Sequence, residues 1–128
     1  MAKFLTKEWL DILTAALAAH DGFKGAIAAV ELSLQFEVPD APEGTLGTYH
    51  IAMHGGTATA LPGAAASPDA TISSAYETAV ALSKGQLNTQ MAFMTGKIKV
   101  AGNIAKLITN QAMLSQYANA SAAVEVEY

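Results

Sequence analysis

The chain offers few side chains whose type and spacing suit chemistry, and its histidines are the first to consider. His50 and His54 are four residues apart, a spacing that would place two metal ligands on one face of a helix. The segment Thr48 to Met53, which holds His50 and ends just before His54, instead alternates polar and apolar residues, which is typical of a strand. Four residues of strand span about 13 Å, too far for both rings to bind one metal ion. The spacing therefore predicts no metal site.

Nucleophile and phosphate motifs are also incomplete. His54-Gly55-Gly56 resembles the oxyanion-hole segment of some esterases, but no Gly-x-Ser-x-Gly nucleophile motif occurs in the chain. Gly96-Lys97 resembles the end of a phosphate-binding loop, yet Met91 stands where that loop needs its first glycine. Cysteine is absent, which excludes thiolate catalysis and disulfides. We expect no catalytic residue and no cofactor. A small enzyme remains an alternative, and its candidate titratable groups are His50, His54 and Tyr76.

Length and hydropathy predict one domain over residues 1–128, because such a chain buries about two thirds of its unfolded surface. Hydrophobic residues make up 52% of the chain, and the mean hydropathy is +0.27. The longest uncharged stretch, residues 44–68, is interrupted by prolines and glycines, so it does not predict a membrane-spanning helix. The first residues lack a long apolar signal core, and we expect a cytoplasmic location.

The charges are segregated along the chain. There is no arginine and the net charge is −4, so nucleic-acid binding is not expected. No acid occurs between Glu77 and Glu125, whereas that segment holds four lysines: Lys84, Lys97, Lys99 and Lys106. Two interpretations stay open, an ordinary solvated face and a basic rim that attracts an anionic headgroup or membrane surface.

The elements that would position these side chains can be traced from periodicity. A helix is predicted after Thr6, a suitable N-cap, and its end is predicted at Asp21-Gly22. His20 would then meet the negative end of the helix dipole as an imidazolium. Residues 29–38 alternate in the way of a strand with one wet face, as in antiparallel sheets. Two further strands around Gly55-Gly56 predict a hairpin.

The second half begins with a short strand over residues 70–73. Ser74 and Glu77 form a possible capping box for a helix, which Lys84-Gly85 would close. Asn88 is expected to cap a short helical turn, and a strand is predicted over residues 97–101.

The last helix is predicted to begin at Asn103, and Gln111 would lie near the centre of its apolar stripe. A buried glutamine needs hydrogen-bond partners, because unpaired polar groups cost about 1–3 kcal/mol. Gln111 could bond backbone groups or water, or it could serve as a polar contact in an apolar ligand cavity.

Methionines and aromatic residues add a soft, adaptable apolar set, which is typical either of an ordinary core or of a promiscuous binding surface. The candidate ligand-binding residues are Phe36, Met53, Met91, Met94, Ile104, Leu107, Ile108 and Gln111.

The run from Ala92 to Asn103, with Pro68-Asp69 and Gly85 before it, resembles the sterol carrier protein type 2 family. The detailed similarity covers roughly residues 68–113. It combines a Pro-Asp pair before a short strand, a helix ended by glycine, a phenylalanine shortly before Gly-Lys, an alternating strand and a Gly-Asn helix start.

The resemblance implies an α+β fold with a five-stranded, mainly antiparallel sheet and helices on one face, enclosing a hydrophobic tunnel. It implies fatty acids, fatty acyl-CoA, sterols or other lipids as ligands, and Gln111 matches a tunnel-facing glutamine of the family. We therefore expect non-catalytic lipid binding or transfer by a monomer or homodimer. The alternatives are an enzyme or enzyme-accessory domain that holds a hydrophobic substrate, and a structural dimerisation domain.

Overall fold

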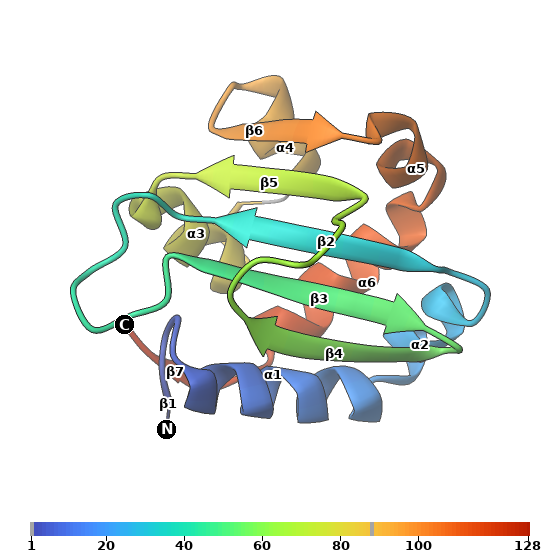
Figure 1. Cartoon of the computed structure of the whole chain (residues 1–128). Helices are drawn as coiled ribbons and strands as arrows, with labels where there is room; N and C mark the ends of the chain where they lie inside the picture. Colours follow the sequence, from blue (N-terminus) through green and yellow to red (C-terminus); the bar gives the residue numbers. More distant parts are fainter. Residues whose placement is uncertain (1, 88) are drawn as a thin grey trace.

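A five-stranded sheet forms one layer of the molecule (Figure 1). The computed structural model describes residues 2–87 and 89–128. The strand order is β4-β3-β2-β5-β6, and only the central β2-β5 pair is parallel. The strands are β2 (Leu32–Glu37), β3 (Thr48–His54), β4 (Thr57–Pro62), β5 (Ala70–Ser74) and β6 (Ile98–Gly102). The predicted α+β class with a mainly antiparallel sheet is confirmed.

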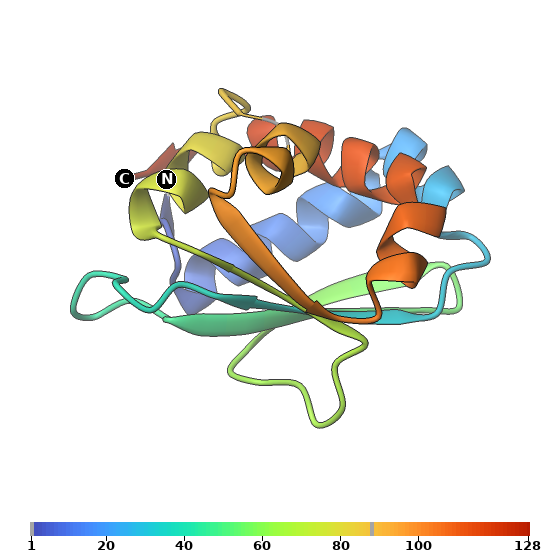
Figure 2. The same ribbon diagram turned by 90° about the horizontal axis from the view of Figure 1, so that it is seen from above.

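The helices cover one face of this sheet, as Figure 2 shows. They are α1 (Lys7–Ala19), α2 (Asp21–Ile27), α3 (Tyr76–Ser83), α4 (Thr89–Met94), α5 (Ile104–Thr109) and α6 (Gln111–Ala122). Two short strands, β1 (Ala2–Lys3) and β7 (Val126–Glu127), pair in parallel and bring the two ends of the chain together. Among the residues described, no helix is long and apolar enough to cross a membrane.

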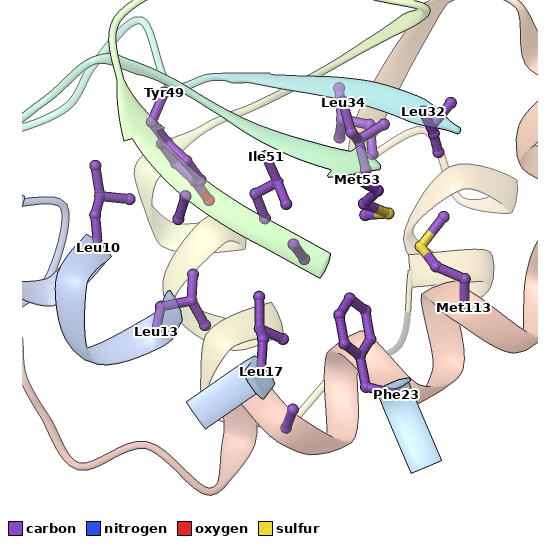
Figure 3. Close-up of a cluster of buried hydrophobic side chains, with 14 of the residues drawn as sticks. Leu10, Leu13, Leu17, Phe23, Leu32, Leu34, Tyr49, Ile51, Met53 and Met113 are labelled. Atoms are coloured by element: carbon purple, nitrogen blue, oxygen red, sulfur yellow. The ribbon is translucent and has the colours of Figure 1, made fainter. Parts of the chain in front are cut away.

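The core lies between the sheet and the helices (Figure 3). Alternation along β3 buries every second side chain, because successive residues of a strand point to opposite faces. The sheet contributes Leu32, Leu34, Tyr49, Ile51 and Met53 to this core. The helices meet them with Leu10, Leu13, Leu17, Phe23 and Met113.

The first helix begins as predicted but ends differently. The Thr6 hydroxyl oxygen accepts a hydrogen bond of 3.3 Å from the Trp9 amide, which confirms the N-cap. The chain then opens a second helix, α2, where the sequence predicted a stop. His20 caps that helix, since its Nδ1 accepts a 3.0 Å bond from the Phe23 amide. His20 is also the C-cap of α1, so its predicted position at the end of that helix is confirmed.

The predicted capping box at Ser74 is also wrong. Ser74 is the last residue of β5, where it pairs with Ile98, and the N-cap position falls on Ala75. Asp40, from the loop after β2, supplies the missing acceptor at 2.8 Å from the Tyr76 amide. The predicted glycine stop is confirmed by the positive φ of Gly85, +74°. The predicted cap at Asn88 lies outside the described residues.

The predicted last helix is two helices with a break at Asn110. The Asn110 side-chain amide donates to the Lys106 carbonyl at 2.8 Å, and the Asn110 backbone amide bonds Leu107 instead. A side chain that takes the acceptor of the helical ladder interrupts that ladder. The predicted cap at Asn103 is confirmed, because its side-chain oxygen accepts a 3.0 Å bond from the Lys106 amide. Gln111 therefore begins α6 rather than continuing one long stripe.

Candidate functional site

Two neighbouring cavities lie between the sheet and the helices. The first, of about 60 Å³, is lined by five aromatic side chains, and we name it the aromatic cavity. The second, of about 190 Å³, is lined mainly by aliphatic side chains of β5, β6, α5 and α6, and we name it the aliphatic cavity. Ile72, Leu114 and Ala118 line both cavities and form the wall between them.

The aromatic cavity is built by rings from separate elements. Phe36 of β2 stacks on Tyr49 of β3, with centroids 4.9 Å apart and planes at 9°. Tyr117 of α6 lies on the same ring of Phe36 at 6.0 Å and 19°. Trp9 of α1 meets Tyr49 edge to face at 5.3 Å, and Phe4 meets Trp9 in the same manner at 4.8 Å. Offset and edge-to-face pairs of this kind stabilise packing beyond their buried area.

The tyrosine hydroxyls give this cavity its electrostatic character. Burial raises the pKa of Tyr49 well above the ordinary value, and the neighbouring Tyr117 raises it further. Burial also raises the pKa of Tyr117, against a smaller opposite effect of its hydrogen bond with Tyr49. Both phenols are therefore held neutral, because a negative charge there would lose its hydration.

The aliphatic cavity opens where large apolar side chains remain exposed. Phe93 and Ile108 both line it, and they are 47% and 60% exposed. Gln111 and Ser115 add the polar groups of α6 to its wall. A mostly apolar hollow with a few polar groups has the composition of a small-molecule site.

The predicted ligand-binding residues divide into three groups. Four of them line the aliphatic cavity: Ile104, Leu107, Ile108 and Gln111. Phe36 lines the aromatic cavity. Met53 lines neither cavity; its side chain is buried in the core (Figure 3). Met91 and Met94 lie exposed on α4 and also line neither cavity.

The sequence prediction did not include the aromatic residues that surround Phe36. Trp9, Tyr49 and Tyr117 line the aromatic cavity, and each carries one polar group on an apolar body. Trp9 was visible as part of an amphipathic stripe, and Tyr49 shares the inward face of its strand with Ile51. Gln111 was predicted as a contact because it carries a polar group among inward-facing apolar residues. The same reasoning would have selected Trp9, Tyr49 and Tyr117.

The three titratable candidates for a small enzyme lie elsewhere. His50 Nδ1 is 2.9 Å from the Gly63 carbonyl oxygen. His54 pairs with Glu31 on the exposed end of the β3-β4 hairpin. Tyr76 packs with Phe4, their centroids 6.1 Å apart. None of the three lines either cavity.

Two of the four lysines in the acid-free segment are already engaged. Lys106 Nζ lies 3.4 Å from a carboxylate oxygen of Asp69. Lys84 Nζ lies 4.7 Å above the ring of Tyr128. Lys97, just before β6, and Lys99, within it, are exposed and have no such partner among the described contacts, so their charges face solvent along this edge strand.

A mostly antiparallel sheet covered on one face by helices, with apolar cavities between the two layers, defines an α+β domain. Residues 13–115 match the model of the SCP-2 sterol transfer family. The chain belongs to this family, as its sequence resemblance indicated.

Known proteins are similar to this chain both in sequence and in fold. Human "Sterol carrier protein 2" is 29% identical over 120 residues, which cover 80% of this chain but only 22% of the human protein. A crystal structure of sterol carrier protein 2 has a TM-score of 0.82 at 21% identity, covering 96% of this chain and all of that one. A solution structure of palmitated SCP2L2 from Aedes aegypti has a TM-score of 0.62 at 22% identity, covering 84% and 91%.

Proposed function

We propose that the protein binds an elongated apolar ligand with one polar end and passes it on without chemical change. Fatty acids, fatty acyl-CoA, sterols and related lipids have this shape. The observation that carries the proposal is the pair of apolar cavities that meet at Ile72, Leu114 and Ala118, in a chain of the SCP-2 sterol transfer family. The palmitated SCP2L2 from Aedes aegypti is a protein of similar fold that carries a fatty acyl group.

The sizes of the cavities indicate how such a ligand would lie. They measure about 60 and 190 Å³, whereas small-molecule sites usually measure about 300–1,000 Å³. A long acyl chain would therefore occupy both cavities and cross the wall between them, which would join them into the tunnel expected from the sequence. Leu114 is only partly buried, and a change of its rotamer would open this wall.

A binding experiment on delipidated protein tests the proposal. We expect a fluorescent acyl probe to bind with a micromolar dissociation constant, and a hundredfold excess over that constant to stabilise the fold by about 2.7 kcal/mol. The thermal shift and the probe fluorescence measure both effects. Absence of binding and of any thermal shift across fatty acids, acyl-CoA, sterols and phospholipids would reject a lipid-binding function.

A matched pair of variants on α6 tests the joined cavities. Ala118→Leu adds three carbons at the wall between the cavities, whereas Ala112→Leu adds them at an exposed position of the same helix. Ala118→Leu should weaken a sixteen-carbon probe about tenfold and an eight-carbon probe much less, because only the longer chain must cross the wall. Equal effects of the two variants would contradict a continuous path.

We further propose that the ligand enters and leaves at an anionic membrane surface. Phe93 and Ile108 are exposed at the mouth of the aliphatic cavity, and Met94 on the neighbouring α4 is 74% exposed. Lys97 and Lys99 lie between α4 and α5 in the sequence and face solvent. Exposed apolar side chains beside cations suit the headgroup region of a bilayer, where each lysine contributes about 1 kcal/mol.

A further inference from the structure

The indole of Trp9 carries a buried donor that is not used within the described structure. Trp9 is 1% exposed. Its Nε1 is the one buried side-chain nitrogen or oxygen, among the described residues, that has no hydrogen-bond partner. Buried polar groups in folded proteins are nearly always paired, and each exception calls for an explanation. An indole N–H only donates, so its missing partner must be an acceptor.

The other polar groups around the aromatic cavity do not supply that acceptor. The Glu37 carboxylate accepts a 2.8 Å bond from the Gln35 side-chain amide. The Ser83 hydroxyl lies 2.7 Å from the Tyr128 hydroxyl, and the Tyr49 and Tyr117 hydroxyls bond each other. Trp9 lines the same cavity as these groups, and its indole nitrogen is paired with none of them.

The charge around the cavity determines which kind of acceptor fits. Glu37 is the lining residue with a formal charge, and among the described residues no lysine or histidine lines this cavity. A carboxylate that entered here would lose its hydration and would meet Glu37 instead of a cation. Burial raises the pKa of both lining tyrosines, which points to the same penalty for negative charge. A neutral oxygen avoids both costs.

We infer that Trp9 donates its indole hydrogen bond to a neutral oxygen of the ligand, a hydroxyl or a ketone or ester carbonyl, seated in the aromatic cavity. The apolar remainder of the ligand extends past Leu114 into the aliphatic cavity. This inference rests on the proposed function and names the ligand class: lipids whose inward end is polar but uncharged. A fatty-acid carboxylate would instead point outward, toward Gln111 and the mouth.

The indole signal of the native protein tests this directly. Trp9 is the single tryptophan of the chain, so ¹⁵N-labelled protein shows one indole N–H resonance. The probes are four twelve-carbon ligands: dodecanol, 2-dodecanone, dodecanoate and dodecane. Dodecanol and 2-dodecanone should move the indole proton downfield as it gains an acceptor. Dodecane and dodecanoate should bind without that shift.

Two variants separate the hydrogen bond from the packing. Trp9→Phe removes the donor and keeps an aromatic ring, and it should weaken dodecanol and 2-dodecanone about tenfold, equivalent to about 1.4 kcal/mol. It should leave dodecane within twofold. Phe36→Leu, in the same cavity but without a polar group, should weaken all four probes alike.

Several results would overturn the inference. The probes could bind while the indole resonance does not respond, or responds equally to dodecane. Either result would mean that the indole does not donate to the ligand. An indole hydrogen directed at the ring of Tyr49 would explain both results. A downfield shift with dodecanoate alone would reject the neutral class. In these cases the proposed lipid binding still stands. Binding of none of the four probes would reject this inference, whereas the proposed function is rejected only if the wider lipid panel also fails. The resonance is read on unaltered protein, so the decision holds even if Trp9→Phe does not fold.

Discussion

At the scale of single residues, the paired phenols of Tyr49 and Tyr117 determine what the aromatic cavity can hold. Both hydroxyls are buried, and their pKa values are raised chiefly by burial. They offer hydrogen bonds without a charge, which suits a binding site for neutral groups more than a site for proton transfer near neutral pH. The raised pKa values of these two tyrosines also make the stability of the fold depend on pH.

Stability should fall in strong base because of this pair. An unfolded tyrosine loses its proton near pH 10, whereas the folded pKa of Tyr49 and Tyr117 is higher. Above about pH 10 the unfolded state therefore binds fewer protons, and the free energy of unfolding decreases by up to about 1.4 kcal/mol per pH unit for each tyrosine. Below that pH the pair contributes its full stabilisation.

Urea unfolding at pH 8 and pH 11 measures this loss. A double variant, Tyr49→Phe with Tyr117→Phe, serves as the control, because it should lose less stability over the same interval. Absorbance at 295 nm provides an independent check. Titration of both phenols near pH 10 in the folded protein would contradict the expected shift.

Gln111 provides the second prediction at this scale. It is exposed at the first turn of α6 and lines the aliphatic cavity. Gln111→Leu should change stability by less than about 0.5 kcal/mol, since surface changes seldom cost more. It should weaken ligands with a hydroxyl or carboxyl at the mouth about three- to tenfold, the usual worth of one hydrogen bond, and leave apolar ligands unchanged or tighter.

Competition binding with a matched alcohol, acid and alkane measures this preference. Gln86→Leu, an exposed glutamine outside both cavities, is the control and should alter none of the three. Equal loss for polar and apolar ligands would show that Gln111 supports the fold rather than the ligand.

At the scale of elements, Asp69 joins the two halves of the sheet to α5. Its carboxylate accepts a 2.7 Å bond from the Ser33 amide and lies 3.4 Å from Lys106 Nζ. Its carbonyl oxygen accepts a 2.8 Å bond from the Asn103 amide. The Pro-Asp pair of the family pattern therefore holds the start of β2, the end of β6 and the first turn of α5 together.

Gly102 is the point in this junction that tolerates no side chain. Its φ is +91°, and a Cβ there would lie 2.6 Å from the Asp69 carbonyl oxygen. Gly102→Ala should therefore destabilise the fold by about 2 kcal/mol or more, through backbone strain and the clash. Gly25→Ala is the control, because nothing lies within 4 Å of its added Cβ, and in α2 it should stabilise by about 0.5–1 kcal/mol. Chemical denaturation of both variants measures the contrast, and similar free energies would contradict it.

At the scale of the whole molecule, the acid-free segment carries the exposed cations Lys97 and Lys99 as well as exposed apolar side chains that line the aliphatic cavity, Phe93 and Ile108. Charge reversal at Lys97 and Lys99 together should slow transfer of a fluorescent lipid to anionic vesicles about tenfold at low salt, and should leave neutral vesicles largely unaffected. Raising the salt concentration should shrink the difference, because ions screen exposed charges beyond a Debye length of about 10 Å at 0.1 M.

A variant with the same net charge controls for long-range effects. Lys3→Glu with Lys24→Glu changes two exposed lysines that lie outside this segment, and it should transfer lipid at nearly the unaltered rate. If both double variants slow transfer equally, the net charge of the protein matters and the local surface does not. If neither responds to salt, Lys97 and Lys99 belong to an ordinary solvated face.

Local patterns in the sequence determined most of the elements. Alternation predicted the strands, and the caps at Thr6 and Asn103 and the glycine at Gly85 were read correctly, because each depends on neighbours within a few residues. The same patterns placed Ile104, Leu107 and Ile108 on an inward face, and the structure brings them to one cavity with Gln111.

Contacts between distant segments were decided only by the tertiary structure. The cap of α3 is Asp40, which lies 36 residues before Tyr76. A pattern of neighbouring residues could suggest Ser74 as the cap but could not identify Asp40. Met53 is buried in the core and Met94 exposed on α4, although their side chains are identical. Periodicity tells which face a residue occupies, but not which other segment covers that face. The packing of the sheet against the helices decides which segment covers a given face. The same packing makes Trp9, with its unused donor, a lining residue of the aromatic cavity.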